Sequence, residues 1–226
     1  MEEINKKWMM IFVVFLSFIP IAVAPVWYGS GDDTGLVGRW SCEGDFKDSS
    51  GQGNHGTQSG GVTITDGYKG RGCGFDGVND WINIPDTSSL ELMPAITVSA
   101  WFKPNNLQTS RIFDKMWNVY SIALLDTGKI NVVLTNTSDV GFNRVTTDVV
   151  YSSNNWYHGV ITYNGSYVRL FLNGAEQTLT GNDFGGSIKN SGNLSIGSYA
   201  LGTTQFFNGS IDEVRIYNRS LSASEI

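Results

Sequence analysis

The chain has few of the residues that metal centres and nucleic-acid surfaces need. Its 226 residues include only 2 Cys and 2 His, and neither cysteine has a His or Cys at zinc-site spacing. Lys and Arg number 15 against 21 Asp and Glu, which gives a net charge of -6. Neutralising a phosphate backbone takes clustered basic side chains. The composition therefore argues against a zinc centre and against a nucleic-acid partner.

Charged side chains are also scarce, at 16% of the chain, whereas glycine and aromatic residues are plentiful, with 27 Gly and 12% Phe, Trp and Tyr. That balance is typical of many short strands joined by tight turns. No internal repeat is evident, and 226 residues suffice for one sizeable β-sandwich. We therefore expect an all-β protein.

A stretch without charged side chains runs over residues 8–28. Lys6 and Lys7 precede it, so the positive-inside rule places the N-terminus in the cytoplasm and the rest of the chain outside. About 20 apolar residues span a bilayer. Residues 1–28 are therefore predicted to be a signal peptide or a transmembrane signal anchor. Cleavage stays open, because residues 22–24 have the small-x-small pattern of a cleavage site but Pro25 follows directly.

The rest of the chain divides into a polar linker, residues 29–35, and one domain, residues 36–226. We expect this domain to be extracellular, either membrane-anchored or secreted. Cys42 and Cys73 fit that location, because an even number of cysteines in an exported chain favours a disulfide; two buried free thiols are the alternative. Five sequons could make the domain a glycoprotein, at Asn136, Asn164, Asn193, Asn208 and Asn218.

The most informative stretch lies near the C-terminus. Alternation along a strand puts Asp212, Val214 and Ile216 on one face. A carboxylate in a core-facing row needs protein donors or a cation, so Asp212 is predicted to have a partner. Residues 209–222 resemble the C-terminal signature of laminin-G-like jelly rolls in the concanavalin A-like lectin/glucanase superfamily, and they read Gly-Ser-Ile-Asp-Glu-Val-Arg-Ile-Tyr-Asn-Arg-Ser-Leu-Ser.

Two further segments carry the same resemblance. Residues 70–85 are similar to a hairpin of this family, with two short strands joined by an Asp-Gly-x-Asn turn. Residues 154–174 contain two Asn-Gly turns between alternating segments, which is typical of an antiparallel meander. The resemblance covers residues 36–226 and implies a two-sheet antiparallel β-sandwich, the jelly roll. The only helix expected in this domain begins at Ser222.

Residues 47–57 form a loop rich in oxygen donors and glycine, the kind of ligand set that calcium prefers. A plain loop satisfied by its own backbone is the alternative. The resemblance implies a structural calcium ion where this loop meets the C-terminal strand. Carried onto this sequence, its ligands are Asp48, Asn54 and Asp212, with Glu43 or Asp45 as possible additions.

The superfamily includes glucanases, so a retaining glycosidase was considered. Such enzymes carry a Glu-x-Asp-x-x-Glu strand, because the two catalytic carboxylates must share one face. The nearest match, Glu43-x-Asp45-x-x-Asp48, ends in Asp, runs into the glycine-rich loop and lies on the first strand. We therefore predict no enzyme activity.

Carbohydrate binding needs an exposed aromatic platform with amide or carboxylate hydrogen-bonding groups. The candidates are Trp117 with Asn118, Tyr199 or Phe206 in glycine-rich connections, and Trp101 on the polar row of its strand. Ordinary packing is the alternative for each. The predicted function is a non-catalytic, extracellular carbohydrate-binding module for a polysaccharide or glycoconjugate. The alternatives are a structural or adhesive surface protein with protein partners or self-association, and a divergent glycoside hydrolase.

Overall fold

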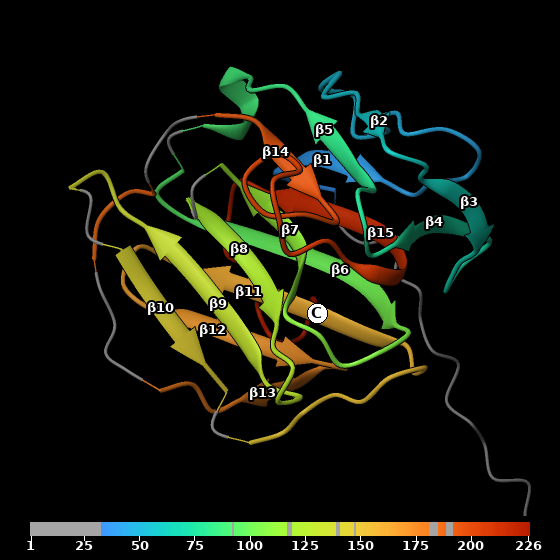
Figure 1. Cartoon of the computed structure of the whole chain (residues 1–226). Helices are drawn as coiled ribbons and strands as arrows, with labels where there is room; N and C mark the ends of the chain where they lie inside the picture. Colours follow the sequence, from blue (N-terminus) through green and yellow to red (C-terminus); the bar gives the residue numbers. More distant parts are fainter. Residues whose placement is uncertain are drawn as a thin grey trace, which may run out of the picture. The chain divides into compact units, whose positions relative to one another are not determined.

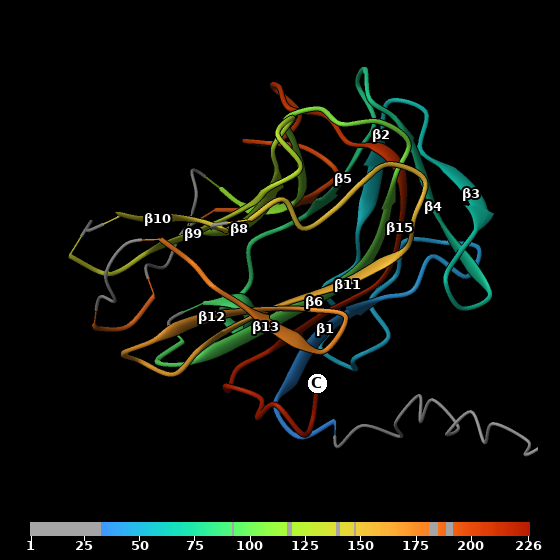
Figure 2. The ribbon, with the colours of Figure 1, turned by 90° about the horizontal axis from the view of Figure 1, so that it is seen from below.

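Two antiparallel sheets lie face to face in the described part of the chain (Figures 1 and 2). The structure is a computed structural model that describes residues 33–91, 93–116, 119–138, 141–146, 148–180, 185–188 and 192–226, with only the backbone at 141 and 142. The predicted export segment, residues 1–28, and most of the predicted linker lie outside these ranges. Among the described residues, no helix has the length and apolar character to cross a membrane.

The larger sheet, called sheet A here, has eight strands. Its order is β13 (Ala175–Gln177), β12 (Val168–Leu172), β11 (Tyr157–Tyr163), β6 (Ile96–Pro104), β15 (Asn208–Tyr217), β4 (Arg71–Asp76) and β3 (Thr63–Asp66), with β1 (Leu36–Trp40) also paired to β15. The C-terminal strand therefore lies in the middle of the sheet.

The second sheet, sheet B, has seven strands. Its order is β10 (Gly141–Val145), β9 (Ile130–Thr135), β8 (Tyr120–Leu124), β7 (Ser110–Lys115), β14 (Leu194–Ile196), β5 (Trp81–Ile84) and β2 (Thr57–Ser59). The only helical segment among the described residues is one 3-10 turn, η1 (Ser88–Leu90). Figure 2 shows the two sheets as separate layers.

The core fills the space between the sheets, and period-two alternation decides which side chains enter it. On β6, Ile96, Val98, Ala100 and Phe102 are buried at 0–1% exposure, while the residues between them face away from sheet B. The two-layer antiparallel sandwich predicted from the sequence is confirmed. The meander is confirmed as well, since β11, β12 and β13 pair in order.

The disulfide predicted between Cys42 and Cys73 is present. It joins the segment after β1 to strand β4, and both cysteines are buried. The first strand ends at Trp40, and Cys42 beyond it adopts a left-handed backbone with φ of 53°.

The expected hairpin in residues 70–85 is wrong, although its two strands and its turn are present. Strand β4 belongs to sheet A and β5 to sheet B, so the turn carries the chain from one layer to the other. Asp80 holds this crossing, because its carboxylate accepts the backbone N–H groups of Asp76, at 2.9 Å, and of Gly61. The local sequence signals a turn, but which sheet each strand joins depends on distant partners.

The helix expected from Ser222 is also not formed in the described chain, where residues 223–225 make a turn. Ser222 and Glu225 make one of the two contacts of a capping box, because the Ser222 N–H donates to the Glu225 carboxylate at 2.8 Å. The Glu225 N–H donates to the backbone carbonyl of Ser222 at 3.0 Å and closes the turn. The sequence pattern that predicts a helix start at Ser222 therefore forms only a single turn in the described chain.

Candidate functional site

The outer face of sheet A carries aromatic side chains that lie outside the core. Trp101 projects from β6 to this face, and His158 of β11 lies directly opposite it in the strand pairing. The two rings stack, with centroids 4.8 Å apart and planes inclined by 16°. Both side chains are half-buried. The two rings lie on the outer surface of sheet A and not in the core between the sheets.

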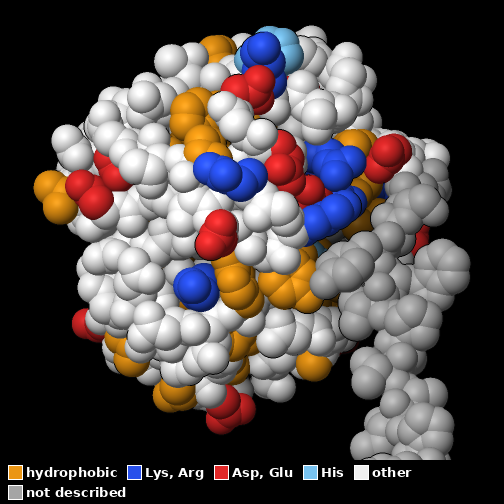
Figure 3. Space-filling view, turned by 90° about the vertical axis from the view of Figure 1, so that its right-hand side faces the viewer, with side chains coloured by type: hydrophobic (Ala, Val, Ile, Leu, Met, Phe, Trp, Pro, Cys, Tyr) orange, Lys and Arg blue, Asp and Glu red, His pale blue; other side chains and the backbone are white. Residues whose placement is uncertain are grey.

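Two more aromatic rings lie against this pair. Tyr68, from the turn between β3 and β4, stacks on Trp101 with ring centroids 3.3 Å apart and planes inclined by 8°. Trp156, which precedes β11, meets Tyr68 edge-on at 6.0 Å and 70°. All four side chains are half-buried. We call Tyr68, Trp101, Trp156 and His158 the aromatic cluster. Figure 3 shows the side on which β3 and β4 lie, where hydrophobic side chains border acidic and basic ones.

Charged groups surround the aromatic cluster. The Lys103 ammonium lies 5.8 Å from the centroid of the Trp156 ring, within the range of a cation–π interaction. Glu213 is buried and accepts hydrogen bonds from Arg39, at 3.2 Å, and from Arg215, at 2.5 Å. The cluster therefore lies between the ammonium group of a half-buried lysine and a buried ion network.

Burial shifts the pKa values of the groups near the cluster. It lowers the pKa of His158 to about 4, with a further lowering from the charge of Arg215, so the imidazole is neutral at pH 7. Burial raises the pKa of Asp212 to about 6, against the backbone hydrogen bonds that lower it. Burial also opposes ionisation of Glu213, but hydrogen bonds and charges from Arg215 and Arg39 lower its pKa overall.

Asp212 faces away from the core, which corrects the expectation that it shares a face with Val214 and Ile216. The pairing of β15 with β6 shifts register between Asp212 and Arg215, and Glu213 has a left-handed φ of 47°. This is a β-bulge, and it reverses the alternation that a regular strand would keep. Val214 and Ile216 stay in the core, whereas Asp212 lies opposite Trp101 on the outer face.

The predicted calcium ligands Asp48 and Asn54 lie together but are satisfied by the protein. The two oxygens of Asp48 accept from the N–H groups of Arg39, Ser50 and Asn54 and from the Ser50 hydroxyl, at 2.8–2.9 Å. The side-chain oxygen of Asn54 accepts from the hydroxyls of Thr87 and Ser89. These are the contacts of a loop closed by its own donors.

The hydrogen bonds of Asp212 go elsewhere, to the backbone N–H groups of Lys69 at 2.9 Å and Glu213 at 2.6 Å. Glu43 accepts from the Arg71 N–H, and Asp45 pairs with Lys47. In the described chain, no group of three or more His, Cys, Asp or Glu side chains is placed to hold a metal ion. The residues therefore do not fit the predicted three-ligand site, and calcium binding stays a prediction.

Glu43, Asp45 and Asp48 lie after the end of β1, in a loop. A retaining glycosidase pair needs two carboxyl groups about 5 Å apart on one face. Here each acid has a separate protein partner, and Asp48 is engaged by four donors. The arrangement does not supply a nucleophile and an acid/base for glycoside hydrolysis.

Of the predicted sugar-binding residues Trp117, Asn118 and Tyr199, only Tyr199 lies in the part of the chain that the structure describes. Trp117 and Asn118 lie outside the described residues. Tyr199 is half-buried in the connection after β14, where the guanidinium of Arg111 lies 4.9 Å from its ring centroid. Arg111 is near the start of β7.

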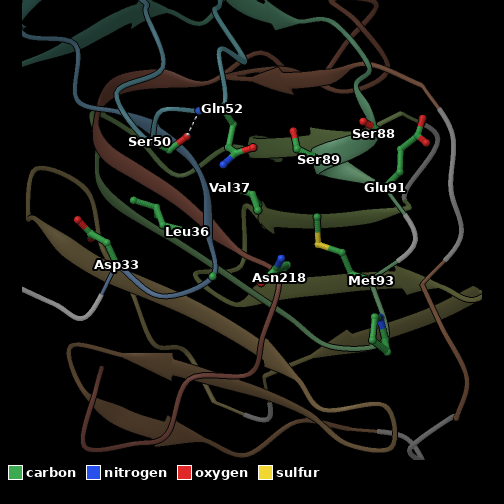
Figure 4. A pocket seen from close by; sticks show the side chains of 12 residues that line it. Asp33, Leu36, Val37, Ser50, Gln52, Ser88, Ser89, Glu91, Met93 and Asn218 are labelled. Carbon is green, nitrogen blue, oxygen red and sulfur yellow. Dashed lines mark hydrogen bonds between the residues drawn. The ribbon is translucent and has the colours of Figure 1, made fainter.

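A polar hollow of about 800 Å³ opens elsewhere on the domain (Figure 4). Its wall includes Ser50, Gln52, Ser88 and Ser89, and Met93 contributes an apolar side chain. Among the described residues no aromatic side chain lines it, and the hydroxyl of Ser89 is already bonded to Asn54. The hollow lacks the ring surface that the aromatic cluster provides.

The five sequons differ in accessibility. Asn164 and Asn218 are exposed, Asn193 and Asn208 are half-buried, and Asn136 is 7% exposed. The Asn136 amide donates to the Gly185 carbonyl and the Asn193 amide donates to Asn83. Asn164 and Asn218 are therefore the positions best placed for a glycan, and glycosylation itself stays a prediction.

The sheet order, the meander and the C-terminal strand agree with a family assignment. A laminin G family model, described as the concanavalin A-like lectin/glucanases superfamily, matches residues 76–226. The chain belongs to this superfamily. The resemblance read from the sequence is confirmed, and the superfamily fold accounts for both sheets. Comparison with curated proteins finds no match.

Solved structures share the superfamily fold. Domain 4 of AbnA, a GH43 extracellular arabinanase from Geobacillus stearothermophilus solved in complex with arabinotriose, is 23% identical, with a TM-score of 0.69 over 84% of this chain and 95% of that domain. The binding domain of Paraclostridial Mosquitocidal Protein 1 is 22% identical, with a TM-score of 0.70 over 84% of this chain and 50% of that one.

The ligand binding domain of botulinum neurotoxin serotype D, solved with N-acetylneuraminic acid, is 15% identical, with a TM-score of 0.68 over 87% of this chain and 50% of that one. This chain thus spans about half the length of the toxin domains that it matches. At these identities the likeness shows a common superfamily fold.

Sequence reasoning named one member of the aromatic cluster as a candidate, Trp101, and missed its partners. The signal for Trp101 was its place on the polar row of β6. His158 gives a similar signal on β11, but a lone histidine on a strand is equally consistent with ordinary packing. Tyr68 gave none, because its ring meets Trp101 only after the turn between β3 and β4 folds over sheet A.

Proposed function

We propose that this chain is a non-catalytic carbohydrate-binding module whose binding surface is the aromatic cluster. One observation carries the proposal: four half-buried rings lie together on the outer face of sheet A, outside the core. Aromatic side chains supply large rigid contact area, and their faces suit the apolar C–H faces of sugar rings. Lys103 adds a hydrogen-bond donor over the ring of Trp156.

The comparison with the arabinanase domain supports the ligand class. That domain is matched over 95% of its length and was solved with arabinotriose bound. The toxin domain solved with N-acetylneuraminic acid supports it less, because the match covers only half of that chain. An arabinan oligosaccharide is therefore the first ligand to test.

The acidic residues favour binding over hydrolysis. The chain's nearest approach to a glycosidase motif lies in a loop with its carboxylates engaged by protein donors. Extracellular placement and attachment to a membrane depend on residues 1–28 and stay predictions.

Binding of the full chain, solubilised in mild detergent, to an array of plant and bacterial polysaccharides tests the proposal. Trp156→Ala removes one half-buried ring of the cluster and is expected to weaken binding by about tenfold or more, as for a binding hot spot. Trp81→Ala is the matched control, because Trp81 is also half-buried but lies on β5 of sheet B. Equal binding by wild type and Trp156→Ala would show that the binding site lies outside the aromatic cluster. If the protein binds no polysaccharide on the array and self-associates in solution, an adhesive protein would be favoured instead.

A further inference from the structure

The turn between β3 and β4 lies over the outer face of sheet A and brings Tyr68 to Trp101. The turn is closed by a hydrogen bond from the Gly67 N–H to the Gly70 carbonyl at 3.1 Å. Nothing in the local sequence fixes where this turn rests on the sheet, since β3 is an edge strand of only four residues. A contact beneath the turn must hold it there.

That contact is the side chain of Asp212. It is 0% exposed, and its carboxylate accepts from the backbone N–H of Lys69, the residue after Tyr68, at 2.9 Å. The backbone N–H of Tyr68 also lowers the pKa of this carboxyl group, against the larger effect of burial, which raises it. The fit is close, because a Cβ added at Gly67 would lie 2.7 Å from the Asp212 carboxylate. The turn therefore rests directly on this carboxylate, with no room for a side chain between them.

The strand pairing places this carboxylate beside the ring that Tyr68 covers. Asp212 and Trp101 are direct partners across β15 and β6, so their side chains emerge next to each other on the same face. The bulge at Glu213 makes this possible by turning Asp212 away from the core. A carboxylate that fixes the backbone of Tyr68 thereby fixes the position of its ring over Trp101.

We propose that Asp212 is a positioning residue of the binding surface: it holds Tyr68 against Trp101 and does not itself touch a ligand. The ligand side of this inference rests on the proposed carbohydrate function, whereas the positioning itself does not. This role also explains why Asp212 is buried without an ion-pair partner among the described residues, since backbone N–H groups stabilise a carboxylate directly. It replaces the role of calcium ligand expected from the sequence.

The test is a double-mutant cycle in the full chain, read by near-ultraviolet circular dichroism and tryptophan fluorescence. Tyr68→Leu defines the spectral contribution of the stacked pair. Asp212→Asn puts an amide donor against a backbone N–H, and we expect it to remove most of that contribution. The double variant should then add little further change, because both substitutions abolish the same ring contact.

Two variants separate positioning from general stability. Asp80→Asn is the matched control, because Asp80 is 2% exposed and also holds a turn through backbone N–H groups, but at the opposite end of the β3–β4 pair from Tyr68. It should lower the free energy of unfolding and leave the Tyr68 signal in place. Gly67→Ala keeps Asp212, but the added Cβ would lie 2.4 Å from the Arg71 carbonyl oxygen and 2.7 Å from the Asp212 carboxylate. It displaces the turn and should reproduce the spectral loss even if Asp212→Asn folds poorly.

Binding to arabino-oligosaccharide supplies a separate readout. Asp212→Asn should weaken binding to the level of Tyr68→Leu. If the wild type binds no sugar, the proposed function is wrong. The double-mutant cycle read by circular dichroism and fluorescence still tests whether Asp212 holds Tyr68 against Trp101. An intact Tyr68 signal in Asp212→Asn, or an equal loss in Asp80→Asn, would overturn the inference. So would a wild-type signal that disappears on adding EDTA and returns with calcium, because a cation would then hold the turn.

Discussion

The imidazole of His158 lies parallel to the indole of Trp101 and is kept neutral by its surroundings. Burial and the charge of Arg215 lower the pKa of His158 to about 4, from an ordinary value of 6.5. A neutral ring can stack on an indole and continue the aromatic surface, whereas an imidazolium would place a second cation beside Arg215. The protein therefore uses His158 as an aromatic residue at neutral pH.

This gives a prediction for the pH dependence of stability. Because the unfolded chain binds a proton at His158 between about pH 6.5 and pH 4 and the folded chain does not, folding is favoured more at the upper end of this window. The contribution is full above pH 6.5 and is lost as the pH falls toward 4. We expect it to be about 1–2 kcal/mol after allowance for partial exposure of the ring.

Asp212 acts in the opposite direction, because its pKa is raised to about 6 and its contribution is lost as the pH rises through that value. The two effects are separated by comparing urea unfolding of wild type and His158→Gln at pH 5 and pH 7. The difference in unfolding free energy between the two proteins should grow with pH. An equal difference at both values would contradict the assigned protonation state.

The Cys42–Cys73 disulfide is expected to stabilise the domain substantially. It closes a loop with a sequence separation of 31 residues, for which the chain-entropy model gives about 3–4 kcal/mol. Adding dithiothreitol should lower the denaturant midpoint of the wild type accordingly. Replacing both cysteines with alanine should abolish the response to the reductant; a persistent response would mean that the reagent acts elsewhere.

Local chemistry made much of the fold predictable. The Asn-Gly turns after β11 and β12 and the alternation of β6 each determine their own structure from a few residues. The crossing at residues 76–80 could not be read this way, because a hairpin and a change of sheet use the same turn residues. Only the partners of β4 and β5, more than a hundred residues away in β15 and β14, distinguish them.

The binding surface was less predictable for a similar reason. Alternation alone places Asp212 with Val214 and Ile216, and only the bulge at Glu213 reverses that placement. The sequence around Glu213 carries no glycine to mark the left-handed position. Because Tyr68 depends on Asp212 for its place over Trp101, missing the bulge also meant missing the aromatic cluster.

Glu213 is predicted to be important for the stability of β15. Its carboxylate is 7% exposed and lies between the guanidinium groups of Arg39 and Arg215. Glu213→Gln leaves both cations near a neutral amide, and removing one partner of a buried pair costs about 3–5 kcal/mol when burial is complete. Since Arg39 and Arg215 are partly exposed, we expect about 2–3 kcal/mol by urea unfolding. Glu176→Gln is the control, because the Glu176–Arg169 pair is exposed and should contribute less than about 1 kcal/mol.

Asp48 tests whether the loop of residues 47–57 is held by its own hydrogen bonds or by calcium. Four donors point at its two oxygens, so Asp48→Ala strands buried N–H groups and should lower the unfolding free energy by about 2–4 kcal/mol. If hydrogen bonds alone hold the loop, this loss is the same with calcium and with EDTA, and the wild-type melting temperature does not change on chelation. Asp45→Ala is the matched control, because Asp45 is exposed in the same segment and accepts one backbone hydrogen bond, from Lys47. A wild-type melting temperature that falls with EDTA, and an Asp48→Ala variant that no longer responds, would instead make this loop a cation site.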